Sequence, residues 1–242
     1  MARASAPLLL IGHRGHRLRR LGQATREMEN SMAAFRRALA AGCDGLELDL
    51  RPSRDGRLVV HHNACLGGAR IEAATWSQLR RLEPRLLTLS DVLRRYGRRC
   101  WLDLELKAPG GERLLLEQLR RHPPRRGFVV SSFDAAVLGR LAAAAPSLPL
   151  CWNLGRRQPL RWPRLGLAYV AAHERRVTAA FLRACRRRHL PVLAWTVNRP
   201  ARMRQLAAIG VAGILSDDPA LLAATLGGGD SRPTPIGNLE TP

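Results

Sequence analysis

The fold follows from two segments that alternate acidic and apolar residues, Asp44-Gly45-Leu46-Glu47-Leu48-Asp49-Leu50 and Asp103-Leu104-Glu105-Leu106-Lys107. Because successive side chains of a β-strand point to opposite faces, the carboxylates of each segment lie on one side of a predicted buried strand. Clustering buried carboxylates without matching cations is costly, so the pattern predicts a bound metal ion. Lys107 is the only lysine among 40 basic residues, which suggests that this position requires an ammonium group.

Strands alternate with helices on both sides of these segments. Strands are predicted at residues 8–12, 44–50 (extended by 58–62 after a turn), 100–106, 127–131, 148–153, 167–172, 191–196 and 213–216. Helices are predicted at residues 31–41, 90–96, 112–121, 134–144, 178–188 and 200–209, and from residue 219 onward. About eight strands with intervening helices predict a (β/α)8 TIM barrel. The alternative is an open doubly wound sheet, but no Gly-rich phosphate loop follows the first strand.

Length and composition favour one large domain. A chain of 242 residues with 46% hydrophobic content buries a full core, which we place in residues 1–226. The last residues, 227–242, lack apolar periodicity and are predicted to be a disordered tail.

The formal net charge of +21 is carried by arginines scattered along the whole chain. Only 5% of the residues are aromatic, and no basic stretch is interleaved with aromatic residues, so we expect no nucleic-acid partner. The arginines are expected on solvated helix surfaces, where they attract anionic substrates.

The five cysteines are odd in number and show no C-x-x-C spacing. They are predicted to be buried free thiols in a reducing compartment. No apolar run approaches the roughly 18 residues of a membrane span, and the run at residues 7–12 is too short for the core of a signal peptide. We therefore expect a soluble, cytoplasmic protein.

In a barrel of this kind the active site forms at the carboxyl ends of the strands. Polar residues gather there, and carboxylates on neighbouring strands suit Mg²⁺ or Ca²⁺. The alternative is that the carboxylates pair with arginines of the barrel. The residues at these strand ends are His13, Arg14, Glu47, Asp49, His62, Glu105 and Lys107.

Two of these residues suit proton transfer. His13 and His62 carry imidazoles that donate or accept a proton near neutral pH, whereas His61 points to the opposite side of its strand. Arg14 and Lys107 are suited to stabilise a phosphoryl group, one through a planar fork and the other as a point charge.

The motifs resemble those of the glycerophosphodiester phosphodiesterase family, in its short, cytoplasmic bacterial form. The likeness extends from residue 11 to about residue 222, with the motifs in the family's order. They include His13-Arg14-Gly15, Glu29-Asn30-Ser31, Gly42-Cys43-Asp44-Gly45-Leu46-Glu47-Leu48-Asp49, Leu104-Glu105-Leu106-Lys107, Trp195-Thr196-Val197-Asn198 and Gly213-Ile214-Leu215-Ser216-Asp217.

The resemblance implies a barrel that hydrolyses a small-molecule glycerophosphodiester to sn-glycerol 3-phosphate and an alcohol with one divalent cation. It assigns Glu47, Asp49 and Glu105 to the metal, the two histidines to acid and base catalysis, and Arg14 and Lys107 to the phosphate. The nucleophile is water or the glycerol 2-hydroxyl of the substrate. Which histidine is the acid stays open.

Two further residues are candidates for substrate binding. Glu29 is expected to bind glycerol hydroxyls or approach the metal, or else to be a first-turn carboxylate favoured by the helix dipole. Trp195 is expected to pack beside the glycerol, or else to belong to the barrel core, and Phe133 has the same two interpretations. His173 and Glu174 are expected near the same rim or exposed to solvent.

The chain departs from the family pattern in three places. Asn63 stands where the family usually has Asp, Gly67-Gly68-Ala69-Arg70 replaces an Arg-Thr-Thr-like stretch, and the segment 17–28 is longer than expected. The small inserted domain between His62 and Thr88 is expected to be absent or reduced. These differences bear on substrate preference and leave the metal carboxylates and both histidines in place.

Two other functions are alternatives. A lysophospholipase D-type activity would need an apolar groove or a membrane-docking face, and no continuous apolar surface stretch is visible in the sequence. A non-catalytic barrel would use its basic surface to bind polyanions in a salt-dependent way. The number of subunits is not indicated by the sequence.

Overall fold

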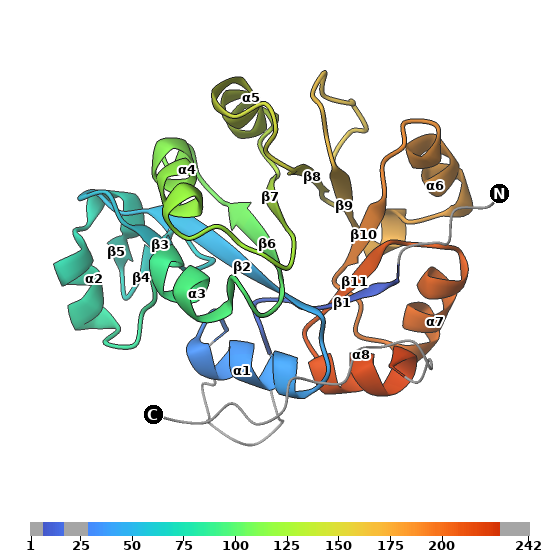
Figure 1. Ribbon diagram of the computed structural model, residues 1–242, viewed down its shortest axis with the longest axis horizontal. Helices are drawn as coiled ribbons and strands as arrows, with labels where there is room; N and C mark the ends of the chain where they lie inside the picture. Colours follow the sequence, from blue (N-terminus) through green and yellow to red (C-terminus); the bar gives the residue numbers. More distant parts are fainter. Residues whose placement is uncertain (1–6, 17–28, 228–242) are drawn as a thin grey trace.

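Eight parallel strands close a barrel in the computed structural model, which describes residues 7–16 and 29–227 (Figure 1). The strands pair in the order β1-β11-β10-β9-β8-β7-β6-β2, and β1 also pairs with β2. This last pairing closes the sheet, so the TIM barrel is confirmed and the open doubly wound sheet is wrong. The strands are β1 (Leu9–Gly12), β2 (Gly45–Pro52), β6 (Trp101–Leu106), β7 (Phe128–Ser132), β8 (Leu150–Leu154), β9 (Tyr169–His173), β10 (Val192–Trp195) and β11 (Gly213–Ser216).

Helices surround the barrel (Figure 1). Ser31 is the N-cap of the first helix, where its hydroxyl accepts a hydrogen bond from the backbone N–H of Ala34. None of the helices in the described part of the chain is both long and apolar enough to span a membrane. The helices are α1 (Met32–Ala40), α2 (Trp76–Leu82), α3 (Leu89–Tyr96), α4 (Glu112–Arg121), α5 (Ala135–Ala144), α6 (Ala179–Arg186), α7 (Pro200–Ala208) and α8 (Pro219–Leu226).

A small insertion follows the second barrel strand. β3 (Leu58–Val60) pairs antiparallel with β2, and the hairpin of β4 (Cys65–Leu66) and β5 (Ala69–Arg70) comes next. A 3₁₀ turn, η1 (Ile71–Ala73), and helix α2 complete the insertion. The sequence did not predict this hairpin or this helix. They share a core of five buried residues, Val59, Ile71, Ala74, Leu79 and Leu86.

The period-2 pattern of the strands separates two cores. Leu46, Leu48 and Leu50 of β2 face outward and join the large cluster between the barrel and its helices. Inward-facing side chains such as Ile11 and Trp101 form a second apolar cluster inside the barrel. The inward positions nearer the carboxyl ends of β2 and β6 are polar, so the apolar filling ends where the candidate site begins.

All five cysteines are free, as predicted, and four of them are buried. Cys65 is exposed, so its predicted burial is wrong. It lies in the short β4–β5 hairpin, which has little apolar surface to cover it.

Two predictions fall largely outside the described residues. The segment 17–28 and the tail from residue 228 onward are not described. The domain boundary at residue 226 therefore stays a prediction, although helix α8 ends at Leu226.

The outward face of β6 offers a test of this packing. Leu104 lies between Asp103 and Glu105 but points into the barrel–helix core, where it is fully buried. We expect Leu104→Ala to lower the free energy of unfolding by about 3 kcal/mol in chemical denaturation, because it leaves a cavity. Leu82→Ala, at a side chain that is 47% exposed, is expected to change it by less than about 0.5 kcal/mol. Equal losses in the two variants would contradict the assignment of Leu104 to this core.

Candidate active site

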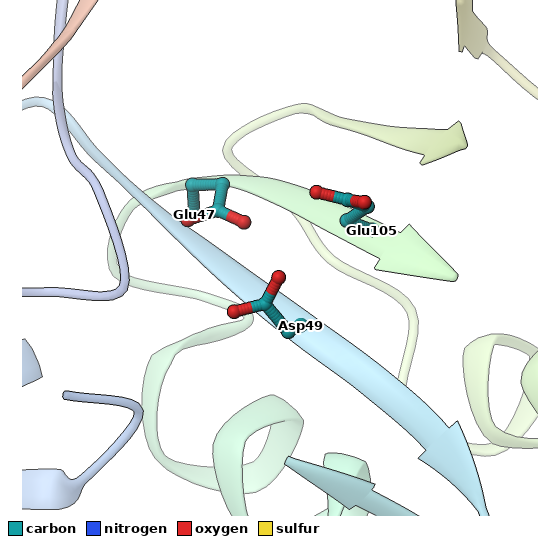
Figure 2. Close-up of side chains that lie close together, drawn as sticks. All are labelled: Glu47, Asp49 and Glu105. Atoms are coloured by element: carbon teal, nitrogen blue, oxygen red, sulfur yellow. The ribbon is translucent and has the colours of Figure 1, made fainter. Parts of the chain in front are cut away.

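Three buried carboxylates lie together at the mouth of the barrel (Figure 2). Glu47 and Asp49 come from β2, and Glu105 comes from the adjacent strand β6. Asp49 is opposite Glu105 in the strand register, and one oxygen from each carboxylate lies within 4.8 Å of the other two. Oxygen ligands in this arrangement suit a divalent cation.

The environment of Glu47 fits a bound cation. Its Oε2 accepts a hydrogen bond of 2.8 Å from the backbone N–H of Arg14, but its Oε1 is buried with no hydrogen-bond partner among the described residues. Burial, followed by repulsion from Asp49 and Glu105, raises the pKa of Glu47. A divalent cation would partner the free oxygen and offset the repulsion, so the carboxylates present fit a metal ion.

The carboxylates do have matching cations, contrary to the premise drawn from the sequence. Lys107 Nζ lies 2.7 Å from Glu105 Oε1 and 3.4 Å from Asp49 Oδ1, and Arg14 Nε lies 3.2 Å from Asp49 Oδ2. Burial disfavours ionisation of Asp49, but Lys107 and Arg14 outweigh it and lower its pKa. The alternative of pairing with barrel arginines is therefore realised at Asp49. Among the described residues, no lysine or arginine side chain forms an ion pair with Glu47, and the imidazole Nε2 of His13 lies 3.9 Å from its Oε2.

Arg14 is held by its backbone as well as by its charge. Its φ of 54° lies in the left-handed region, which turns its N–H toward Glu47 and its guanidinium toward Asp49 and Glu29. Asn30, also at positive φ, donates a 2.8 Å hydrogen bond to Asp49 Oδ2. The role of Asn30 was missed, although it stands within the Glu29-Asn30-Ser31 motif.

Glu29 lies before helix α1, which begins at Met32, so its interpretation as a first-turn helix carboxylate is wrong. Its Oε1 accepts a 2.9 Å hydrogen bond from Arg14 Nη1. Glu29 therefore contacts the predicted phosphate-binding arginine and reaches the site through that residue.

His13 is oriented by residues from the far end of the chain. Its Nδ1 lies 2.7 Å from Asp217 Oδ1, and its Nε2 lies 3.9 Å from Glu47 Oε2. Asn198 donates a 2.8 Å hydrogen bond to the other oxygen of Asp217. Asp217 and Asn198 stand within recognisable motifs, but no role for them was predicted from the sequence, because their contact depends on closure of the barrel.

His62 lies just after β3 and faces the same pocket as His13. Its Nδ1 lies 2.9 Å from the side-chain oxygen of Asn63, and burial lowers the pKa of His62. Arg51 Nε donates a 3.0 Å hydrogen bond to the carbonyl of His62, and Arg51 also pairs with Glu72 at 2.7 Å. Through Glu72 of the 3₁₀ turn η1, the insertion thus connects to the barrel beside His62.

Aromatic side chains line the opposite wall. Trp195, at the end of β10, makes edge-to-face contacts with Phe133 and His173, with ring centroids 5.5 and 5.4 Å apart. Phe133 is 37% exposed, and Lys107 Nζ lies 5.5 Å from its ring centroid. Glu174 instead lies close to Arg202, with 3.3 Å between Oε2 and Nε.

Asp103 also faces the pocket but was not predicted as a site residue. It lies opposite Glu47 in the β2–β6 register, and Ser131 Oγ donates a 2.5 Å hydrogen bond to it. Burial raises the pKa of Asp103 to about 7. The same period-2 argument that selected Glu105 could have found it, because Asp103 lies two residues earlier on the same strand face.

A cavity of about 200 Å³ lies at the centre of this site. Seven of the nine predicted site residues line it directly, Asp49 lies in the carboxylate cluster beside it, and Glu29 contacts Arg14. The lining residues are His13, Arg14, Glu47, His62, Asp103, Glu105, Lys107, Phe133, Asn153, Ala171, Trp195 and Leu215.

Residues 13–221 match the model of the glycerophosphoryl diester phosphodiesterase family. The chain belongs to this family. Its resemblance to the family, inferred from the motifs, is thereby confirmed. A glycerophosphodiester phosphodiesterase of Caldanaerobacter subterraneus subsp. tengcongensis is 27% identical over 239 residues, which cover 88% of this chain and 96% of the relative.

Solved structures of glycerophosphodiester phosphodiesterases have the same fold. The enzyme from Parabacteroides distasonis is 22% identical, with a TM-score of 0.79 over 93% of this chain and 98% of that chain. A phosphodiesterase from Oleispira antarctica, solved in complex with the product sn-glycerol-3-phosphate, is 23% identical, with a TM-score of 0.77 over 91% of this chain and 97% of that chain.

The carboxylate cluster leads to a test by thermal unfolding. We expect Mg²⁺ or Ca²⁺, at about a hundred times its Kd, to raise the melting temperature by roughly 5–10 °C, because the ion binds only the folded site. Glu47→Gln is expected to abolish this shift. Glu117→Gln, on the outer helix α4, is the matched control and is expected to retain it. An unchanged melting curve of the wild-type protein with both ions would count against the metal site.

Proposed function

We propose that this protein hydrolyses glycerophosphodiesters to sn-glycerol 3-phosphate and an alcohol, with Mg²⁺ or Ca²⁺ bound by Glu47, Asp49 and Glu105. The proposal is supported chiefly by one observation: two histidines, two cations and the carboxylate cluster adjoin a single cavity at the carboxyl ends of the strands. Membership of the family and the names of its relatives give further support.

The positive groups of the cavity suit a phosphodiester. When bound, the divalent cation polarises a phosphoryl oxygen. Lys107 presents a compact ammonium between Glu105 and Asp49, and Arg14 presents a guanidinium whose position is set by Glu29 and Asp49. Both groups stabilise the negative charge that grows on the phosphoryl oxygens during the reaction.

The two histidines perform the proton transfers. One imidazole takes a proton from the nucleophile, and the other gives a proton to the departing alkoxide. Asp217 holds Nδ1 of His13, so Nε2 of the same ring faces the side of the cavity that contains Glu47. The carbonyl of His62 is held by Arg51, which limits the movement of the loop that carries the second imidazole.

We also propose that the protein works in the cytoplasm. Its five cysteines are all free, and Cys65 is an exposed thiol, as expected in a reducing compartment.

The reaction is tested by release of sn-glycerol 3-phosphate from glycerophosphocholine and from glycerophosphoethanolamine, with either cation or with chelator. We expect release with a cation and none with chelator. His13→Ala and His62→Ala are each expected to lower kcat by about 10²- to 10⁴-fold, because each removes one proton-transfer group.

His61→Ala is the matched control for the histidine variants. His61 is adjacent to His62, but its Nε2 lies 3.3 Å from the carbonyl of Cys65 and its ring is not part of the cavity lining. We expect this variant to keep kcat within about twofold. Full activity of His13→Ala, or release in the presence of chelator, would overturn the proposed chemistry.

A further inference from the structure

Asn153 is a buried residue whose amide oxygen has no hydrogen-bond partner among the described residues, and it lines the cavity. It lies near the carboxyl end of β8, and only 5% of its surface is exposed. Its Oδ1 is buried and accepts no hydrogen bond from any residue in ranges 7–16 and 29–227. Buried polar groups are nearly always satisfied, so an unsatisfied amide at a cavity wall indicates a ligand atom that satisfies it.

The cavity has two chemically different halves. The first half contains the carboxylates, histidines and cationic side chains. They lie on β2 and β6 or directly after β1, β3 and β6. The half formed by β7 to β11 is lined by Phe133, Ala171, Trp195 and Leu215, together with Asn153. Since the cationic groups hold the phosphoryl group in the first half, a group esterified to the phosphorus extends into the second.

The second half suits a small group. Ala171 is the neighbour of Asn153 in the β8–β9 register, and its methyl group leaves space beside the amide. The described lining of this half carries no acidic or basic side chain. It therefore offers no counter-ion to a charged head group, and its apolar surfaces suit the carbon atoms of a short polyol.

We propose that Asn153 determines specificity by binding a hydroxyl of the small polyol group attached to the phosphorus, which under the proposed function is the glycerol. An amide has one accepting oxygen and a donating NH₂ group, and a hydroxyl both donates and accepts, so the two are complementary. The indole N–H of Trp195 is also buried without a partner among the described residues and offers a second donor on the same wall.

This role has a signature that a purely structural role lacks. An amide that bonds within the protein stabilises the fold, and its replacement lowers the melting temperature. Asn153 makes no such bond in the described structure, so the isosteric Asn153→Leu is expected to keep or raise the melting temperature of the ligand-free protein while weakening recognition.

The test compares two ligands that share the phosphoryl group and the three-carbon chain. Titration calorimetry with Mg²⁺ present measures the Kd of sn-glycerol 3-phosphate and of n-propyl phosphate, which lacks the hydroxyls. The wild-type protein is expected to prefer sn-glycerol 3-phosphate by about tenfold or more. Asn153→Leu is expected to lose this preference, because the substitution raises the Kd of sn-glycerol 3-phosphate and leaves that of n-propyl phosphate unchanged.

Gln118→Leu is the matched control. Gln118 carries another buried amide oxygen without a partner among the described residues, but it lies on helix α4, outside the cavity lining. This variant is expected to keep the ligand preference of the wild-type protein. The inference would be overturned if Asn153→Leu weakened the binding of both ligands equally or left the preference unchanged. It would also be overturned if the wild-type protein bound the two ligands equally well.

Failure of this inference is distinguishable from failure of the proposed function. The binding comparison requires no turnover, so a preference that depends on Asn153 supports the inference even if no glycerophosphodiester is hydrolysed. Conversely, turnover of glycerophosphocholine with an unchanged preference in Asn153→Leu would overturn the inference and leave the proposed function standing.

Discussion

Repulsion among the carboxylates inside the barrel is the constraint on which the rest of the site depends. The parallel register of β2 and β6 puts Asp49 opposite Glu105 and Glu47 opposite Asp103, all four buried. Like charges so placed must be neutralised by protons, by cations of the protein or by a metal ion. Lys107 and Arg14 neutralise one part of the cluster, whereas burial and repulsion from Asp49 and Glu105 raise the pKa of Glu47, and the arrangement of the carboxylates is compatible with a divalent cation.

Closure of the barrel brings together other residues of the candidate site. β1 pairs with β11 on one side and with β2 on the other, so the first strand lies between the carboxylates and the last strand. The pairing of Gly12 with Ser216 brings the following residues, His13 and Asp217, within hydrogen-bond distance. The orientation of His13 is therefore a property of the closed barrel, and a partly folded chain would contain the histidine without its partner.

The two halves of the cavity differ in the chemistry of their lining residues. The charged half, built on β1, β2 and β6, suits the phosphoryl group and the cation, and the aromatic and apolar half suits an uncharged carbon skeleton. Much of the charged half could be predicted from the sequence, because its residues follow strand alternation and recognisable motifs. In the apolar half, the sequence predicted Trp195 and Phe133 as candidates, but it did not predict Asn153 and Ala171, because these two lie in strands without a recognisable motif and only the tertiary structure places them at a cavity.

The sequence by itself determined the alternation of strands and helices, the inward direction of Glu47, Asp49 and Glu105, and family membership, because these depend on local periodicity and on short motifs. Only the tertiary structure decided which charges meet. It paired Asp49 with Lys107 and Arg14, placed Glu29 before helix α1, and left the amide oxygen of Asn153 without a hydrogen-bond partner in the described part of the chain. These contacts join residues that are distant along the chain, and their geometry is set by the closure and register of the barrel, which no local pattern encodes.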